Sequence, residues 1–344
     1  MPPRKPAPKT TNRATSKARK KRPHRSSEGI RTKWIGFRLF RDGSGAPIRR
    51  FYNLDTLASA TDRLLREKRN FIARAVQGIL GPAEIIHLEF ELTRENNYRF
   101  VFRVEAGNAR RKQAQLAFVA AKHHENYSKV LATEHHNLRV LHERAPDHIV
   151  KPFAGGRVWL PPGRRKDQPR REVYAYLTQW MGGFHEIALD AKGRLAVLGQ
   201  GKKAYSKAQV EVIKKEVALA VLRSYDAETQ TAMEIPQIAS GDLVVTPPPK
   251  AEPRLKITGC RRLLKNATPA KLIHRIARAE WETEDTAFAL APEDPGVLAD
   301  AVHNALGRET GRMWFQHYLH ALNRGRFKEH PALPREAIEA FASQ

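Results

Sequence analysis

A lysine and a glutamate twelve residues apart are the first candidates for chemistry in this chain. Lys122 ends the apolar run 118–122, and Glu134 lies in the following segment, 131–138, which has a helical composition. An apolar strand ending in a lysine, followed by a helix carrying a glutamate, can bring an ammonium and a carboxylate together inside a fold. A buried lysine needs such a partner, because an unpaired charge away from water is costly. The pattern therefore predicts an ion pair, which in nucleotide-binding proteins positions the lysine against phosphates.

The elements that must position this pair follow from the spacing of apolar residues. Three consecutive strands are predicted, then the helix that carries Glu134, then two more strands. After residue 182 the pattern changes to a strand, a proline-containing loop and a strand, together with several helices. Since all five early strands could share one antiparallel sheet, the fold class predicted is α+β. The five early strands are expected over 85–92, 98–105, 115–122, 149–153 and 173–179. The two later strands are expected over 241–245 and 255–257, and the later helices over 206–222 and 269–341.

The N-terminal 30 residues differ from the rest of the chain. They carry ten Lys and Arg residues, Lys20, Lys21 and Arg22 among them, and their first acidic residue is Glu28. Prolines and small polar residues fill the gaps, so little apolar area can be buried, and a disordered basic tail is predicted. Such a tail is either a contact for nucleic acid or a localisation signal, or it is a non-specific polycation.

The composition points to an anionic partner. Lys and Arg number 61 against 36 Asp and Glu, which gives a formal net charge of +25 over 344 residues. This charge favours nucleic acid, phosphate-bearing ligands or an anionic surface. The single cysteine, Cys260, excludes an intramolecular disulfide and fits a reducing compartment. No apolar run approaches the roughly 20 residues that span a membrane. The expected location is the cytoplasm, or the nucleus in a eukaryote.

The order of elements resembles the protein kinase-like superfamily, which includes the aminoglycoside and choline phosphotransferase types. The resemblance covers roughly 85–320. It rests on Lys122 at the end of the third strand, on Glu134 in the next helix, on the segment 176–183, which is similar to the hinge between two lobes, and on Gly241-Asp242-Leu243, which is similar to the start of a catalytic loop.

The resemblance implies a two-lobed fold and a set of roles. It implies ATP as the ligand, with Lys122 holding phosphates, Glu134 orienting Lys122, and Gln179 and Met181 in the hinge that faces the adenine. It also implies Asp242 as the general base on an acceptor hydroxyl. From the residues alone, Gly-Asp is also ordinary turn chemistry. The expected parts are a tail (1–30), a small α+β extension (31–84), an antiparallel five-stranded N-lobe with one helix (85–182) and a mostly helical C-lobe (183–344).

The sequence departs from this family where the metal should bind. Pro247 stands where an asparagine ligand is expected, and the segment 255–262 contains no acid where the second aspartate ligand is expected. The segment 92–98, over the phosphates, contains no glycine. Phosphoryl transfer depends on Mg²⁺, so the pattern does not favour a Mg²⁺ site. The basic pair Arg261-Arg262 would occupy that place, either as a direct phosphate contact or as surface charge.

Two hypotheses follow. The first is a kinase-like protein with degenerate metal ligands, either a pseudokinase that acts as a binding or scaffold protein or an atypical ATP-dependent phosphotransferase. The second is a non-enzymatic protein associated with nucleic acid, in which the tail and two basic segments, 110–112 and 164–171, neutralise phosphates. A protein partner is compatible with both hypotheses.

Overall fold

The structure is a computed structural model that describes residues 30–35, 52–67, 70–122, 124–160, 171–190, 192–198, 204–235, 241–248, 252–282, 287–327 and 333–343. The helices are α1 (Tyr52–Leu65), α2 (Phe71–Leu80), α3 (Glu125–Arg144), α4 (Lys207–Arg223), α5 (Pro269–Ala277), α6 (Pro295–Leu306), α7 (Arg308–Asn323) and α8 (Arg335–Ser343). The strands are β1 (Arg31–Ile35), β2 (Ile85–Glu95), β3 (Arg99–Asn108), β4 (Gln113–Ala121), β5 (Pro152–Trp159), β6 (Glu172–Gln179), β7 (His185–Leu189), β8 (Leu195–Val197), β9 (Ala232–Met233), β10 (Leu243–Val245), β11 (Leu255–Ile257), β12 (Leu263–Leu264), β13 (Glu280–Glu282) and β14 (Ala287–Ala289).

The largest sheet has six strands in the order β1-β2-β3-β4-β6-β5. Strands β2 to β6 pair antiparallel with their neighbours, which confirms the five-stranded antiparallel sheet predicted from the sequence. The fourth predicted strand, 149–153, is displaced: β5 covers Pro152–Trp159, and Ile149 instead bridges to Ile257. β1 adds a sixth strand at the edge, parallel to β2, with Trp34 opposite Phe90. The two rings stack with centroids 4.2 Å apart. This contact fixes β1 to the sheet, because aromatic cross-strand pairs are among the stronger ones in sheets.

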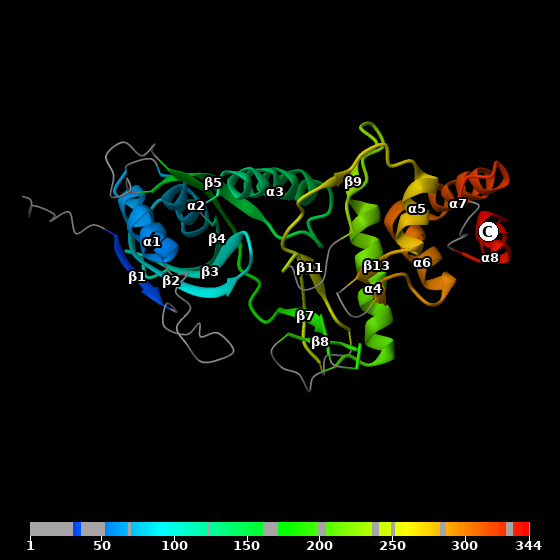
Figure 1. The fold of residues 1–344 in the computed structure, drawn as a ribbon, viewed down its shortest axis with the longest axis horizontal. Helices are drawn as coiled ribbons and strands as arrows, with labels where there is room; N and C mark the ends of the chain where they lie inside the picture. The colour runs from blue at the N-terminus through cyan, green and yellow to red at the C-terminus, as the bar shows by residue number, and fades with distance from the viewer. Residues whose placement is uncertain are drawn as a thin grey trace, which may run out of the picture.

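Helices α1, α2 and α3 lie with this sheet at one end of the molecule (Figure 1). α2 contacts β4 and β5, and α3 contacts β4, β5 and β6. The helical part of the small α+β extension consists of two helices, α1 and α2, because Asn70 caps α2 by accepting a hydrogen bond from the Ala73 N–H at 2.6 Å. β1 therefore belongs to the large sheet, and α1 and α2 pack against it and share its core.

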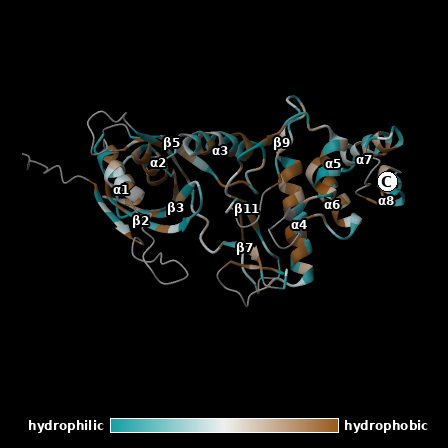
Figure 2. Ribbon diagram, in the orientation of Figure 1, coloured by the Kyte–Doolittle hydropathy of each residue, from teal (hydrophilic) through white to brown (hydrophobic). Residues whose placement is uncertain are grey.

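The rest of the described chain forms a smaller, four-stranded sheet, two two-stranded sheets (β9 with β12, and β13 with β14) and a group of helices (Figure 1). The four-stranded sheet has the order β11-β10-β7-β8, and its antiparallel pair of β10 and β11 confirms the strand, loop and strand expected around residue 250. Helix α4 begins at a capping box formed by Ser206 and Gln209 and buries its apolar side, which is brown in Figure 2, against β9 and α6. The protein is therefore of the mixed α+β class. Within the ranges described above, no helix combines the length and apolar character needed to cross a membrane.

Candidate functional site

A buried arginine, Arg99, lies at the centre of the candidate site. The turn between β2 and β3 is held by Asn96, whose side-chain oxygen accepts hydrogen bonds from the N–H groups of Tyr98 at 3.2 Å and Arg99 at 2.9 Å. β3 therefore begins at Arg99. Successive strand side chains point to opposite faces, so Arg99 shares a face with Val101, while Phe100 lies on the other. The side chain of Arg99 is 3% exposed.

Arg99 forms an ion pair with Glu134, which projects from α3. The Arg99 Nη1 atom donates to Glu134 Oε1, and the hydroxyls of Tyr176 and Tyr98 also donate to this carboxylate, the latter at 3.4 Å. Glu134 is fully buried. Burial raises the pKa of Glu134, and the charge of Arg99 opposes that rise. Burial disfavours the charge of Arg99, but the carboxylates of Glu134 and Asp242 outweigh this and raise its pKa.

Asp242, which precedes β10, connects Arg99 to a second arginine. Its Oδ1 lies 3.4 Å from Arg99 Nη2, and its Oδ2 lies 2.5 Å from Arg261 Nη2. The chain is close-packed here: a Cβ built at Gly259 would lie 2.8 Å from Asp242 Oδ1. Only glycine fits at 259 without displacing the carboxylate. Glu134, Arg99, Asp242 and Arg261 thus form a continuous row of alternating charge that crosses from the large sheet to the smaller one.

The predicted ion pair between Lys122 and Glu134 is not formed. The Lys122 Nζ atom lies 2.6 Å from Glu95 Oε1 and 5.3 Å from the centre of the Phe100 ring. The reason is that side chains along a strand alternate between its two faces. Ala120 is the register partner of Phe100, so Lys122, two residues later, lies on the same face as Phe100. Arg99 lies on the opposite face and reaches Glu134 instead.

Gln179 and Met181 line a small cavity of about 150 Å³. The apolar side chains of Val101, Ala117 and Val119 contribute to its wall, together with Val244 from β10. The Gln179 N–H donates to the carbonyl of Lys151 at 2.8 Å, and the Met181 carbonyl accepts from the Phe184 N–H at 3.1 Å. A volume of this size is below the roughly 300 Å³ of the smallest usual ligand pockets, so the cavity has room for part of a ligand, such as one planar ring.

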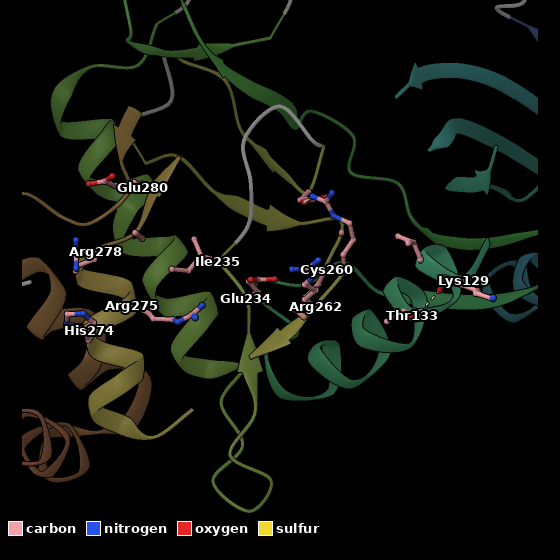
Figure 3. Close-up of a pocket in the computed structure, with 15 residues that line it drawn as sticks. Lys129, Thr133, Glu234, Ile235, Cys260, Arg262, His274, Arg275, Arg278 and Glu280 are labelled. Atoms are coloured by element: carbon pink, nitrogen blue, oxygen red, sulfur yellow. Dashed lines mark hydrogen bonds and ion pairs between the residues drawn. The ribbon is translucent and has the colours of Figure 1, made fainter. Parts of the chain in front are cut away.

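A much larger cavity, of about 930 Å³, adjoins Asp242. Figure 3 shows its lining residues between α3, which carries Lys129 and Thr133, and α5, which carries Arg275 and is followed directly by Arg278. Of the predicted phosphate contacts, Arg261 and Arg262 both line this cavity. Cationic side chains outnumber acidic ones around it. The cations are Lys129, Arg261, Arg262, Arg275 and Arg278, and the acids are Glu234, Asp242 and Glu280.

The residues around Asp242 do not fit a divalent cation. Mg²⁺ needs carboxylate or other oxygen ligands with free lone pairs. Both oxygens of Asp242 face guanidinium groups, and Glu134 accepts from Arg99 and two tyrosines. A metal ion placed here would meet the charges of Arg99 and Arg261 at close range. The groups around Asp242 are therefore guanidinium donors that already face its carboxylate.

Cys260 is a core residue. It is 5% exposed, its Sγ–H donates to the Arg262 carbonyl at 3.1 Å, and burial raises the pKa of its thiol to about 12. Its own carbonyl accepts from the Asn137 side chain at 3.0 Å. The thiolate needed for nucleophilic chemistry is therefore strongly disfavoured.

The sequence patterns do not point to the residues that organise and surround this site, above all Arg99, Arg275 and Arg278. Arg99 had one detectable signal, since it lies two residues after Asn97 and at the second position of the predicted strand 98–105. Arg275 on α5 and Arg278 just after it had none, because arginines on and beside a helix surface are usually solvated. The tail residues Lys20, Lys21 and Arg22 and the basic segment 161–170 lie outside the described residues.

No protein-family model matches the sequence, and a search of curated proteins also found no match.

Proposed function

We propose that this chain is a non-catalytic binding protein, a kinase-like domain that holds a phosphate-bearing nucleotide through arginines and without a metal ion. The observation that carries the proposal is the position of Asp242. Its carboxylate lies between Arg99 and Arg261 at the edge of the large cation-lined cavity.

This position removes Asp242 from catalysis. A general base must accept a proton from a hydroxyl at hydrogen-bond distance, about 2.6–3.2 Å. Each oxygen of Asp242 already faces a guanidinium group, and the side chain is 5% exposed. An acceptor hydroxyl would have to displace Arg261 before it could reach the carboxylate. The proposal therefore assigns Asp242 the role of holding Arg261.

The cations of α5 and its surroundings supply the phosphate contacts. Arg262, Arg275 and Arg278 are exposed and line the same cavity, and none of them forms an ion pair with another residue of the described ranges. Arginine binds phosphate oxygens with two parallel hydrogen bonds, which suits it to hold a phosphate chain without Mg²⁺. The small apolar cavity beside Met181 adjoins this region through Gly241 and Thr258 and would take the base.

The test is ATP binding by the full chain, measured by calorimetry in excess EDTA and again in Mg²⁺. The double variant Arg275→Gln/Arg278→Gln should bind ATP at least tenfold more weakly than the wild type. The matched control is Arg63→Gln/Arg324→Gln, which removes the same charge from exposed arginines on α1 and after α7. Binding that requires Mg²⁺, phosphoryl transfer to an acceptor, or an equal loss in the control would contradict the proposal.

A second candidate function, association with nucleic acid, is favoured by the net charge of +25. A polycation of this kind releases counterions when it binds a phosphate backbone, so its affinity falls steeply with salt. The two functions are compatible, because they use different parts of the chain.

A further inference from the structure

A second hollow, which shares no lining residue with the cavity beside Asp242, is lined without a single acidic residue. It has a volume of about 740 Å³ and lies between α2, α3 and the start of β5, which run close together in Figure 1. None of its thirteen lining residues is Asp or Glu. The cavity beside Asp242 contains three acids, so the two sites differ in kind.

Three cations from three separate elements surround this hollow. Arg74 comes from α2, Arg139 from α3, and Lys151 precedes β5. All three are exposed, and within the described ranges none of them has an ion pair. Cations brought together without a counter-charge repel one another, and an anion in the hollow relieves that repulsion.

Small and aromatic residues shape the hollow. A Cβ built at Gly78 meets nothing within 4 Å, whereas one at Gly155 would lie 2.7 Å from His135 Nδ1 and from the Tyr174 hydroxyl. Two partly exposed aromatic rings, those of Phe153 and Tyr174, contribute to the lining, and Lys151 Nζ lies 5.8 Å from the Phe153 ring centre. Cations beside accessible aromatic rings are the combination that single-stranded nucleic acid recognises, with phosphates on the cations and bases stacked on the rings.

We propose that this hollow binds single-stranded nucleic acid, with backbone phosphates on Arg74, Arg139 and Lys151 and a base against Phe153 or Tyr174. The inference rests on the second candidate function, nucleic-acid association, and assigns it a site on the folded domain. It is independent of the nucleotide site beside Asp242. The open rim and the three exposed cations favour an extended polyanion over a compact phosphate.

The test is the fluorescence anisotropy of a fluorescein-labelled oligothymidylate titrated with the full chain at several salt concentrations. The variant Arg74→Gln/Arg139→Gln should weaken binding at least tenfold at low salt. It should also lower the slope of log K against log salt by about 1.4, at roughly 0.7 per lost phosphate contact. The control Arg63→Gln/Arg324→Gln has the same charge and should change affinity less than threefold.

A second variant separates the hollow from general electrostatic attraction. Gly78→Leu keeps every charge and fills open space on α2, and it should weaken binding at least threefold, while Gly78→Ala should bind as the wild type does. Circular dichroism verifies that each variant is folded.

The outcomes distinguish failure of this site from failure of nucleic-acid association itself. If the strand binds but Gly78→Leu and Arg74→Gln/Arg139→Gln behave as their controls, nucleic-acid association stands and the hollow is not its site. If inorganic pyrophosphate displaces the strand from the hollow at equal concentration of phosphate groups, the site is one for small phosphates and the proposal is wrong. If the strand does not bind at all, both the site and the second candidate function fail.

Discussion

Arg99 and Glu134 form an ion pair in the interior of the protein, and it takes the place of the Lys122–Glu134 pair expected from the sequence. The side chains are 3% and 0% exposed, and two tyrosine hydroxyls complete the bonding of the carboxylate. Two charges withdrawn from water in this way are stable only together. The pair also holds Asp242, through the second nitrogen of the same guanidinium group.

Removing Arg99 should therefore destabilise the fold strongly. Arg99→Met leaves Glu134 buried and unpaired, which should lower the free energy of unfolding by about 3–5 kcal/mol in urea denaturation. The control is Arg103→Met on the same strand and face. Its guanidinium is 36% exposed and lies 2.6 Å from Glu91, so that loss should stay below about 1 kcal/mol. Equal losses in both variants would show that the buried Arg99–Glu134 pair contributes no more to the free energy of unfolding than an exposed ion pair.

Lys122 should be dispensable for ligand binding. It pairs with Glu95, and the two side chains are 16% and 20% exposed. Lys122→Met should bind ATP as the wild type does in calorimetry with EDTA, and should lose about 1 kcal/mol or less of stability. Arg261→Met, in contrast, should weaken binding at least fivefold. A loss of ATP affinity in Lys122→Met alone would restore the role that the resemblance implies for this lysine.

The sequence predicts the large sheet and the main helices because their signals are local. Alternating apolar residues mark β2 and β3, a continuous apolar run marks β4, and a mostly apolar segment marks β6. A serine followed three residues later by glutamine marks the start of α4. These patterns fix which side chains are buried, and none of them depends on distant parts of the chain.

The site is less accessible to sequence reasoning, because it depends on register and on long-range contacts. Moving by one position along a strand exchanges its faces, and this is why Lys122 lies away from Glu134 while Arg99 reaches it. The contact between Arg99 and Asp242 joins residues 143 positions apart. No local sequence pattern indicates such a contact. The spacing of apolar residues can therefore locate β3 and β10 without showing that Arg99 and Asp242 meet.

Removing the charge of Asp242 should strengthen anion binding. Asp242→Asn keeps the shape of the side chain but releases Arg261, which now pairs with Asp242 at 2.5 Å, to face the large cavity. Calorimetry in EDTA should show ATP binding that is several-fold tighter than in the wild type. In a phosphotransferase whose general base is this aspartate, the same change would abolish turnover and give no reason for tighter ATP binding. Unchanged or weaker ATP affinity would therefore contradict the proposed binding role.

Cys260 should report on opening of the site. Its thiol is buried, and its pKa is raised to about 12, first by desolvation and then by the charge of Glu134. Ellman's reagent at pH 8 should label the native protein at least a hundredfold more slowly than the urea-unfolded chain. Because Asn137 and Arg262 hold the segment around Cys260 through backbone and thiol hydrogen bonds, rapid labelling without denaturant would mean that this segment opens readily.

The stability of the protein should fall between pH 6.5 and pH 4 because of His135. Burial, with the charges of Arg139 and His136, lowers its pKa from 6.5 to about 4. Over this range the unfolded chain binds a proton at His135 and the folded protein does not, so the stabilisation is complete above pH 6.5 and is lost as the pH falls. The full loss from this group is about 3 kcal/mol at most. His135→Gln should flatten the dependence of unfolding free energy on pH in this range, whereas His136→Gln, at an exposed position on the same helix, should flatten it less, because it removes only the last of these three causes. Carboxylates also titrate near pH 4, so the difference between the two variants is the measured quantity, and identical pH profiles would show that His135 is protonated in the folded state.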